Sequence, residues 1–153
     1  MAHMELRIAP PIVLLIAAAL DVVLGLLDPT PELPITVRIA AAGVLLALAL
    51  AIFARALSTL HAAQTTANPY APQRTTALVT HGIFAVTRNP MYLGMVVALL
   101  AIAAAFGSPL ALVSVVLFTG YIDRWQIRPE ERALLQAFGP EFAEYCRRTR
   151  RWI

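Results

Sequence analysis

A group of polar residues stands at the start of an apolar segment in the second half of the chain, between His81 and Gly94. Arg88 offers a guanidinium, Asn89 an amide and Tyr92 a hydroxyl. Gly94 would let a ligand or another helix approach the backbone closely. Such a set could bind a small polar molecule, but Arg88 could also only anchor a helix at the membrane surface. The residues define a candidate site and leave both interpretations open.

Two adjacent acids, Glu130 and Glu131, follow the last apolar segment. Acids are common in the first turn of a helix, where the helix dipole favours negative charge. A short helical hairpin would separate the two acids from Arg88, so we expect the three side chains to lie close together. Opposite charges in a low-dielectric environment are costly, which favours a functional interpretation of this grouping. A third polar group, residues 68–72, predicts only a proline-rich turn.

The composition is that of a protein that lies within a membrane. Hydrophobic residues make up 59% of the 153 residues and charged residues 14%, and the mean hydropathy is +0.73. Soluble domains carry about one quarter charged residues. The single cysteine, Cys146, excludes a disulfide within the chain and a cysteine metal cluster, and we expect no metal. We predict an all-α integral membrane protein with one domain over residues 4–153; residues 1–3 resemble a cloning remnant.

Four apolar segments are expected to cross the bilayer, whose core of about 30 Å needs about 20 helical residues. They cover residues 8–27, 35–60, 90–106 and 110–125, and the last two are short. A signal peptide is the alternative for the first segment, but the apolar run continues to Leu27, past the point where cleavage would fall. Asp21 is the only charged residue inside that run. Proline-rich residues 28–34 and residues 107–109 predict turns.

The arginines predict the orientation, and all twelve basic residues are arginine. Eleven of them fall on one side of the four predicted spans, so we expect both termini in the cytoplasm, at a bacterial inner membrane. Arg38, near the start of the second span, is the exception, and we expect it to reach toward the membrane surface. Residues 129–150 predict a cytoplasmic tail that starts a new helix with Pro129 at its first position. Gly139 and Pro140 should divide this tail into two short amphipathic helices.

Two spaced motifs resemble those of the isoprenylcysteine carboxyl methyltransferase and phospholipid methyltransferase superfamily. They read Gly82-x5-Arg88-Asn89-Pro90-x-Tyr92-x-Gly94 and Glu130-Glu131-x3-Leu135-x2-Phe138-Gly139-x2-Phe142-x2-Tyr145. The resemblance covers residues 57–152 and implies a membrane-embedded methyltransferase that uses S-adenosylmethionine and releases S-adenosylhomocysteine. Eukaryotic carboxyl methyltransferases of the superfamily usually have histidine in place of Asn89 and a proline-containing tail in place of residues 151–153. These departures bear on the substrate more than on the reaction.

The resemblance also implies roles for single residues. The cofactor would be bound by His81, Gly82, Asn89, Tyr92, Gly94, Glu130 and Glu131, and Arg88 and Glu131 would be catalytic. The acids would meet the ammonium or the sulfonium of the cofactor, and Arg88 would hold an acceptor carboxylate in line with the methyl group. A carboxylate acceptor, such as that of an isoprenylcysteine-like molecule, needs no general base. An amine or a thiol would need one, and His81 or His61 would be the candidate.

Two other classes of protein stay open as alternatives. One is an NADPH-dependent membrane reductase of the steroid-reductase type, which has a similar helical layout. The other is a non-catalytic membrane subunit or small transporter, although transporters place polar groups at mid-membrane, where this chain has only Asp21. The expected partners are a lipophilic small-molecule acceptor and membrane lipids, without nucleic acid. The chemical class of the acceptor and the oligomeric state stay open.

Overall fold

A computed structural model describes residues 8–28, 33–64 and 77–153, and all regular elements in these ranges are helical. The main helices are α1 (Pro10–Leu27), α2 (Ile35–Ala62), α3 (Pro90–Phe106), α4 (Leu112–Ile122) and α5 (Arg128–Arg148). The short elements are the 3-10 helices η2 (Gly82–Ala85) and η3 (Pro109–Ala111) and the π-helical turn η4 (Asp123–Ile127). The predicted polar turn at residues 68–72 lies outside the described residues, as do Arg7 and Arg74.

Three stretches of helix are long and apolar enough to cross a membrane, as expected for an integral membrane protein. They are Pro10–Leu27, Ile35–Ala62 and the combined stretch Pro109–Arg148. The fourth apolar helix, α3, has 17 residues, which corresponds to about 26 Å at 1.5 Å per residue. It is therefore shorter than a bilayer core of about 30 Å.

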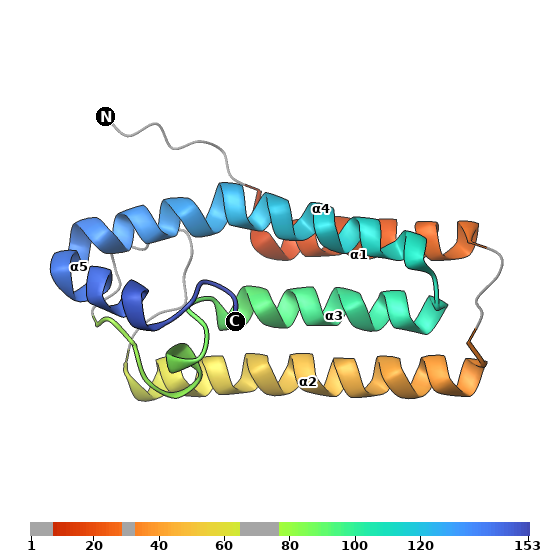
Figure 1. The fold of residues 1–153 in the computed structure, drawn as a ribbon, viewed down its shortest axis with the longest axis horizontal. Helices are drawn as coiled ribbons and strands as arrows, with labels where there is room; N and C mark the ends of the chain where they lie inside the picture. Colours follow the sequence, from red (N-terminus) through yellow and green to blue (C-terminus); the bar gives the residue numbers. More distant parts are fainter. Residues whose placement is uncertain (1–7, 29–32, 65–76) are drawn as a thin grey trace.

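The short helix α3 lies at the centre of the bundle, between α2 on one side and the pair α1 and α4 on the other (Figure 1). Leu99 of α3 is fully buried in a core that it shares with Phe118 and Ile122 of α4. Large apolar side chains of α1, α2 and α4 are exposed instead, which is the arrangement expected where helices meet lipid. Pro90 and Tyr92 at the start of α3 are buried as well, so polar residues placed there have a rigid support.

A hydrogen bond within the apolar bundle joins α1 to α4. Asp21 is fully buried, and the hydroxyl of Ser114 donates to its Oδ1 at 2.8 Å. A second hydrogen bond joins the end of α1 to the turn between α3 and η3, where Ser108 Oγ donates to Asp28 Oδ2 at 2.7 Å. Asp21, which interrupts the first apolar segment, therefore faces α4 and is shielded from lipid.

The predicted turn after α3 is formed around Gly107, which ends the helix with a left-handed φ of 67°. Arg38, at the start of α2, turns inward to this end of α3. Its Nε and Nη2 donate to the carbonyl of Ala105 at 3.0 and 2.6 Å. The guanidinium thus binds a carbonyl that α3 leaves without a partner, at the negative end of the helix dipole.

The sequence predicted a separate helix with Pro129 at its first position; α5 does begin one residue earlier, at Arg128, but no break separates it from the fourth span. The helix continues from α4 through η4 into α5. In η4 the N–H of Arg128 donates to the carbonyl of Asp123, five residues back. The proline ring would obstruct the carbonyl four residues back in a regular α-helix. A wider π turn relieves this conflict and lets the helix continue.

The predicted break at Gly139 and Pro140 does occur. Gly139 has φ 50° and ψ −123°, which no α-helical residue adopts. The second half of α5 therefore turns back, and the C-terminus lies beside the start of α3 (Figure 1). This reversal brings the last residues of the chain to the predicted site.

Candidate active site

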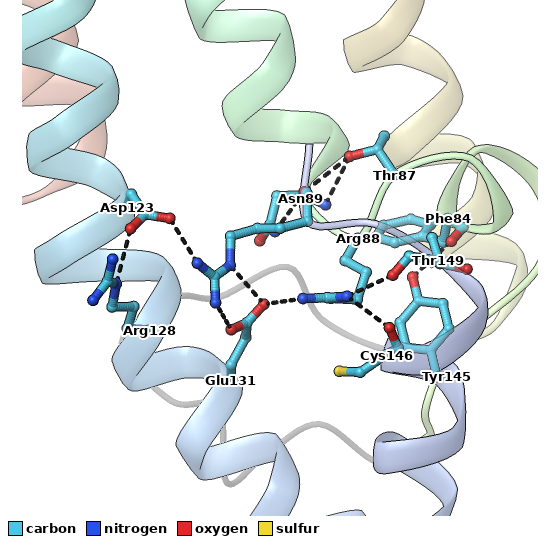
Figure 2. A network of polar contacts seen from close by, with 11 residues as sticks. Phe84, Thr87, Arg88, Asn89, Asp123, Arg128, Glu131, Tyr145, Cys146 and Thr149 are labelled. Atoms are coloured by element: carbon cyan, nitrogen blue, oxygen red, sulfur yellow. Dashed lines mark hydrogen bonds and ion pairs between the residues drawn. The ribbon is translucent and has the colours of Figure 1, made fainter. Parts of the chain in front are cut away.

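The predicted site lies where the C-terminal segment runs past the residues that precede α3 (Figure 2). The N–H of Arg88 donates to the carbonyl of Arg150 at 3.0 Å. The Thr87 hydroxyl and the Asn89 amide donate to the carbonyl of Arg151 at 3.2 and 3.0 Å. Asn89 stands at the N-cap position of α3, yet its side chain makes this contact and does not cap the helix. These bonds fix the backbone of the C-terminal segment against the start of α3.

The guanidinium of Arg88 connects the start of α3 with both parts of α5. Its Nη2 donates to Glu131 Oε1 at 2.7 Å, and its Nη1 donates to the carbonyls of Cys146 and Thr149. Those carbonyls lie at the C-terminal end of α5, where the helix dipole favours a cation. The side chain is 12% exposed, and its buried Nε has no hydrogen-bond partner in the described part of the chain.

Glu131 is also bound by a second guanidinium, that of Arg151. Arg151 Nε donates to Glu131 Oε1 at 3.1 Å and Nη2 to Oε2 at 2.6 Å, a bidentate arrangement. Arg151 Nη1 reaches Asp123 Oδ1 at 3.0 Å, and Asp123 Oδ2 accepts from Arg128 Nε at 2.8 Å. We call this alternating series Arg88–Glu131–Arg151–Asp123–Arg128 the ion-pair chain; Figure 2 labels Arg88, Glu131, Asp123 and Arg128.

The π turn explains how one arginine reaches both acids of the ion-pair chain. Asp123 and Glu131 are eight residues apart, which in a regular α-helix is about 80° more than two full turns. A π turn holds about one more residue than an α turn. Two turns that include η4 therefore take up about eight residues, so the two carboxylates lie on the same face, toward Arg151.

The charges of the ion-pair chain stabilise one another. The fourth span predicted from the sequence ends at residue 125, so Glu131 and Arg151 lie outside it. Burial alone would raise the pKa of Glu131, but hydrogen bonds from Arg151 and Arg88, together with their charges, bring that pKa below its ordinary value. The hydrogen bond to Glu131 is the main reason why the pKa of Arg151 is raised. Both groups are therefore charged at neutral pH.

The second predicted acid, Glu130, faces a different partner. The Tyr92 hydroxyl donates to Glu130 Oε1 at 2.7 Å. The structure thus brings both adjacent acids to residues of the first motif, Glu130 to Tyr92 and Glu131 to Arg88. Gly94, two residues after Tyr92 in α3, faces α2, where a Cβ would lie 3.2 Å from Phe53 Cδ2. The close approach that Gly94 permits is therefore between two helices.

The remaining predicted residues, His81 and Gly82, are exposed and lie at η2. Gly82 has a left-handed φ of 61°, and a Cβ there would lie 3.1 Å from Thr59 Oγ1 of α2. Within the described ranges, neither residue takes part in the ion-pair chain. Their part in cofactor binding stays a prediction.

Sequence reasoning missed three members of the ion-pair chain, Asp123, Arg128 and Arg151. Arg128 and Arg151 were counted only among the arginines that set the orientation, and Asp123 fell without comment inside the predicted span 110–125. Their partnership depends on the π turn and on the reversal of α5 at Gly139, neither of which follows from an α-helical pattern. The available signal was the alternation of acids and arginines after the last apolar segment.

Comparison with known proteins gives a consistent result. A family model described as phospholipid methyltransferase matches residues 37–141, which include the Arg88 segment and both acids. An uncharacterised protein of Haemophilus influenzae is 38% identical over 63 residues, which is 41% of this chain and 100% of that protein. No solved structure matches the chain.

Proposed function

Since the chain belongs to the phospholipid methyltransferase family, within the superfamily that its two motifs resemble, we propose that it transfers a methyl group from S-adenosylmethionine to a lipophilic acceptor. The observation that carries this proposal is the meeting of both motifs at one place. Arg88 and Tyr92 of the first motif each contact one of the two adjacent acids of the second. The contacts lie at the start of the central helix.

The residues of the site suit this cofactor. S-adenosylmethionine carries a sulfonium and an amino-acid group with one positive and one negative charge. The site offers carboxylates on Glu130, Glu131 and Asp123 beside guanidinium groups, so each charge of the cofactor finds an opposite one. When bound, the cofactor would supply a methyl group that is activated by the positive sulfur.

We propose separate tasks for the residues of the chain. Glu130 and Glu131 bind the positive groups of the cofactor, and Tyr92 orients Glu130 through its hydroxyl. Arg88 orients Glu131, because its guanidinium is itself fixed by the carbonyls at the end of α5. Such pre-oriented charges lower the barrier because they need not reorganise during the reaction.

The acceptor that we propose is a carboxylate on a lipophilic molecule of the isoprenylcysteine type. A carboxylate can be methylated without removal of a proton. An amine would need a base, and neither His81 nor His61, the candidates for that task, belongs to the ion-pair chain. The membrane location supports an acceptor that enters from lipid.

The first test concerns the cofactor. S-adenosylhomocysteine should raise the melting temperature of the purified protein, because a ligand at 100 times its Kd stabilises the folded state by about 2.7 kcal/mol. NADPH should have no effect. A shift with NADPH alone would indicate a membrane reductase, and no shift with any of these ligands would indicate a non-catalytic subunit. The same protein incubated with methyl-labelled cofactor and a membrane extract should form a product that releases labelled methanol in base, as an ester does and an N-methyl product does not.

We also propose that both termini face the cytoplasm. Among the described arginines, all except Arg38 fall in the parts of the chain expected on that side. Reporter fusions at the C-terminus and within residues 28–34 should give opposite results. A periplasmic signal from the C-terminal fusion would contradict this orientation.

A further inference from the structure

We infer that the ion pair between Glu131 and Arg151 is the binding place of the amino-acid group of the methyl donor. In this assignment Glu131 binds the ammonium and Arg151 binds the carboxylate, so the ion pair opens when the ligand enters. Asp123 is then a positioning residue, which holds the Arg151 guanidinium in place. The inference rests on the proposed function and adds Arg151 to the residues that touch the cofactor.

The backbone of Arg151 is fixed, while its side chain is accessible. Its carbonyl accepts the hydrogen bonds from Thr87 and Asn89. The side chain is 33% exposed, whereas that of Arg88 is 12% exposed. Of the two guanidinium groups on Glu131, the one that an entering ligand can reach and move is therefore that of Arg151. The Arg151 side chain can move away from Glu131 while its carbonyl stays bound to Thr87 and Asn89.

The ion-pair chain allows this pair to open without an isolated charge on either side. Glu131 would keep its hydrogen bond from Arg88, and Arg151 would keep its hydrogen bond to Asp123. A guanidinium has five N–H donors, and the contacts of Arg151 use three of them. Separation from Glu131 would free two of these three, which is the number that a bidentate bond to a ligand carboxylate requires.

The charge of the ligand matches the opened pair. An amino-acid group brings one ammonium and one carboxylate, so a single ion pair becomes two and the net charge of the site is unchanged. A ligand with the ammonium alone would displace Arg151 and give its guanidinium no new partner. The pair should therefore select ligands that carry the complete amino-acid group.

The test compares two ligands by calorimetry on the full-length protein in detergent. One is S-adenosylhomocysteine, and the other is its decarboxylated analogue, which keeps the amino group. Arg151→Gln should weaken S-adenosylhomocysteine binding at least tenfold, or about 1.4 kcal/mol. The same variant should bind the analogue as well as the parent does, or more tightly. Arg148→Gln is the matched control, because Arg148 is exposed and pairs with Glu144 outside the site, so it should change neither affinity.

The outcomes separate this inference from the proposed function. If Arg151→Gln binds S-adenosylhomocysteine as well as the parent or better, Arg151 only blocks the site and the inference is wrong. If the parent itself does not bind S-adenosylhomocysteine, the proposed function fails and the inference fails with it. Should Arg151→Gln not fold, Asp123→Asn keeps the guanidinium but weakens its positioning. That variant should lower the affinity for S-adenosylhomocysteine and not for the analogue, and an equal loss for both ligands would overturn the assignment.

Discussion

Replacement of Arg88 by lysine is expected to slow methyl transfer about thirty-fold to a thousand-fold, which corresponds to about 2–4 kcal/mol in the transition state. One Nη of Arg88 binds Glu131, and the other binds two carbonyls at the end of α5. A lysine ammonium is a single point charge and cannot hold both groups in this geometry. Because Glu131 would lose its orientation, the affinity for S-adenosylhomocysteine should fall as well.

The measurement combines folding yield, S-adenosylhomocysteine binding and methyl transfer for Arg88→Lys and Arg88→Ala. Arg55→Lys is the matched control, since Arg55 is an exposed arginine of α2 near the same end of the bundle. Normal turnover in Arg88→Lys would show that Arg88 only anchors the helix. Loss of turnover with unchanged cofactor affinity would instead assign Arg88 to the carboxylate of the acceptor, as the sequence suggested.

Glu131→Gln is expected to weaken S-adenosylhomocysteine binding at least a hundredfold, or about 2.8 kcal/mol. The glutamine is similar in size, but it removes the carboxylate that two guanidinium groups share. In the glutamine, an NH2 group replaces one of the two carboxylate oxygens. This NH2 group would face a guanidinium N–H, so two hydrogen-bond donors would oppose each other. Arg151 would keep Asp123, but the largely buried guanidinium of Arg88 would lose its carboxylate partner.

Glu144→Gln is the control for this variant, because Glu144 is a more exposed acid of the same helix. It should leave cofactor affinity unchanged. If the Glu131→Gln protein binds S-adenosylhomocysteine as tightly as the parent, Glu131 is not a cofactor ligand.

The pH dependence of stability gives an independent measure of the same residue. The pKa of Glu131 in the folded protein lies below its ordinary value of 4.5. Its ion pairs therefore contribute fully above pH 4.5, and their contribution is lost as the pH falls through the lower folded pKa. The melting temperature of the parent should fall over this acidic range more steeply than that of Glu131→Gln. Equal slopes would show that the ion pairs add nothing to stability.

The sequence predicted the parts of the fold that depend on apolar runs and on strong helix breakers. The helix expected over residues 90–106 is α3, bounded by Pro90 and by Gly107, which adopts the left-handed conformation. The break at Gly139 and Pro140 was also expected, although the reversal of the chain there was not. The continuous helix across Pro129 was not, because proline normally ends a helix. A single wide turn removes that conflict, and the sequence pattern carries no sign of it.

The site was predictable where both partners belong to a recognisable motif. Arg88 and Glu131 were expected to meet, and they do. The glycine positions were more ambiguous, because a glycine indicates a close approach and does not identify the approaching group; Gly94 and Gly82 both meet α2. Arg151 could not be placed from sequence, since its position depends on a reversal of the chain and on two hydrogen bonds to its carbonyl.

The bond between Asp21 and Ser114 bears on how the protein enters its membrane. The two residues are 93 positions apart, so a growing chain presents α1 to the bilayer before the partner of Asp21 has been synthesised. An aspartate at the centre of an inserting helix costs about 2.5–3.5 kcal/mol, and each surrounding leucine, isoleucine or valine contributes about 0.3–0.6 kcal/mol in favour of insertion. The apolar side chains of α1 therefore keep it in the bilayer as a weakly held helix. The later arrival of α4 supplies the hydroxyl that fixes its position.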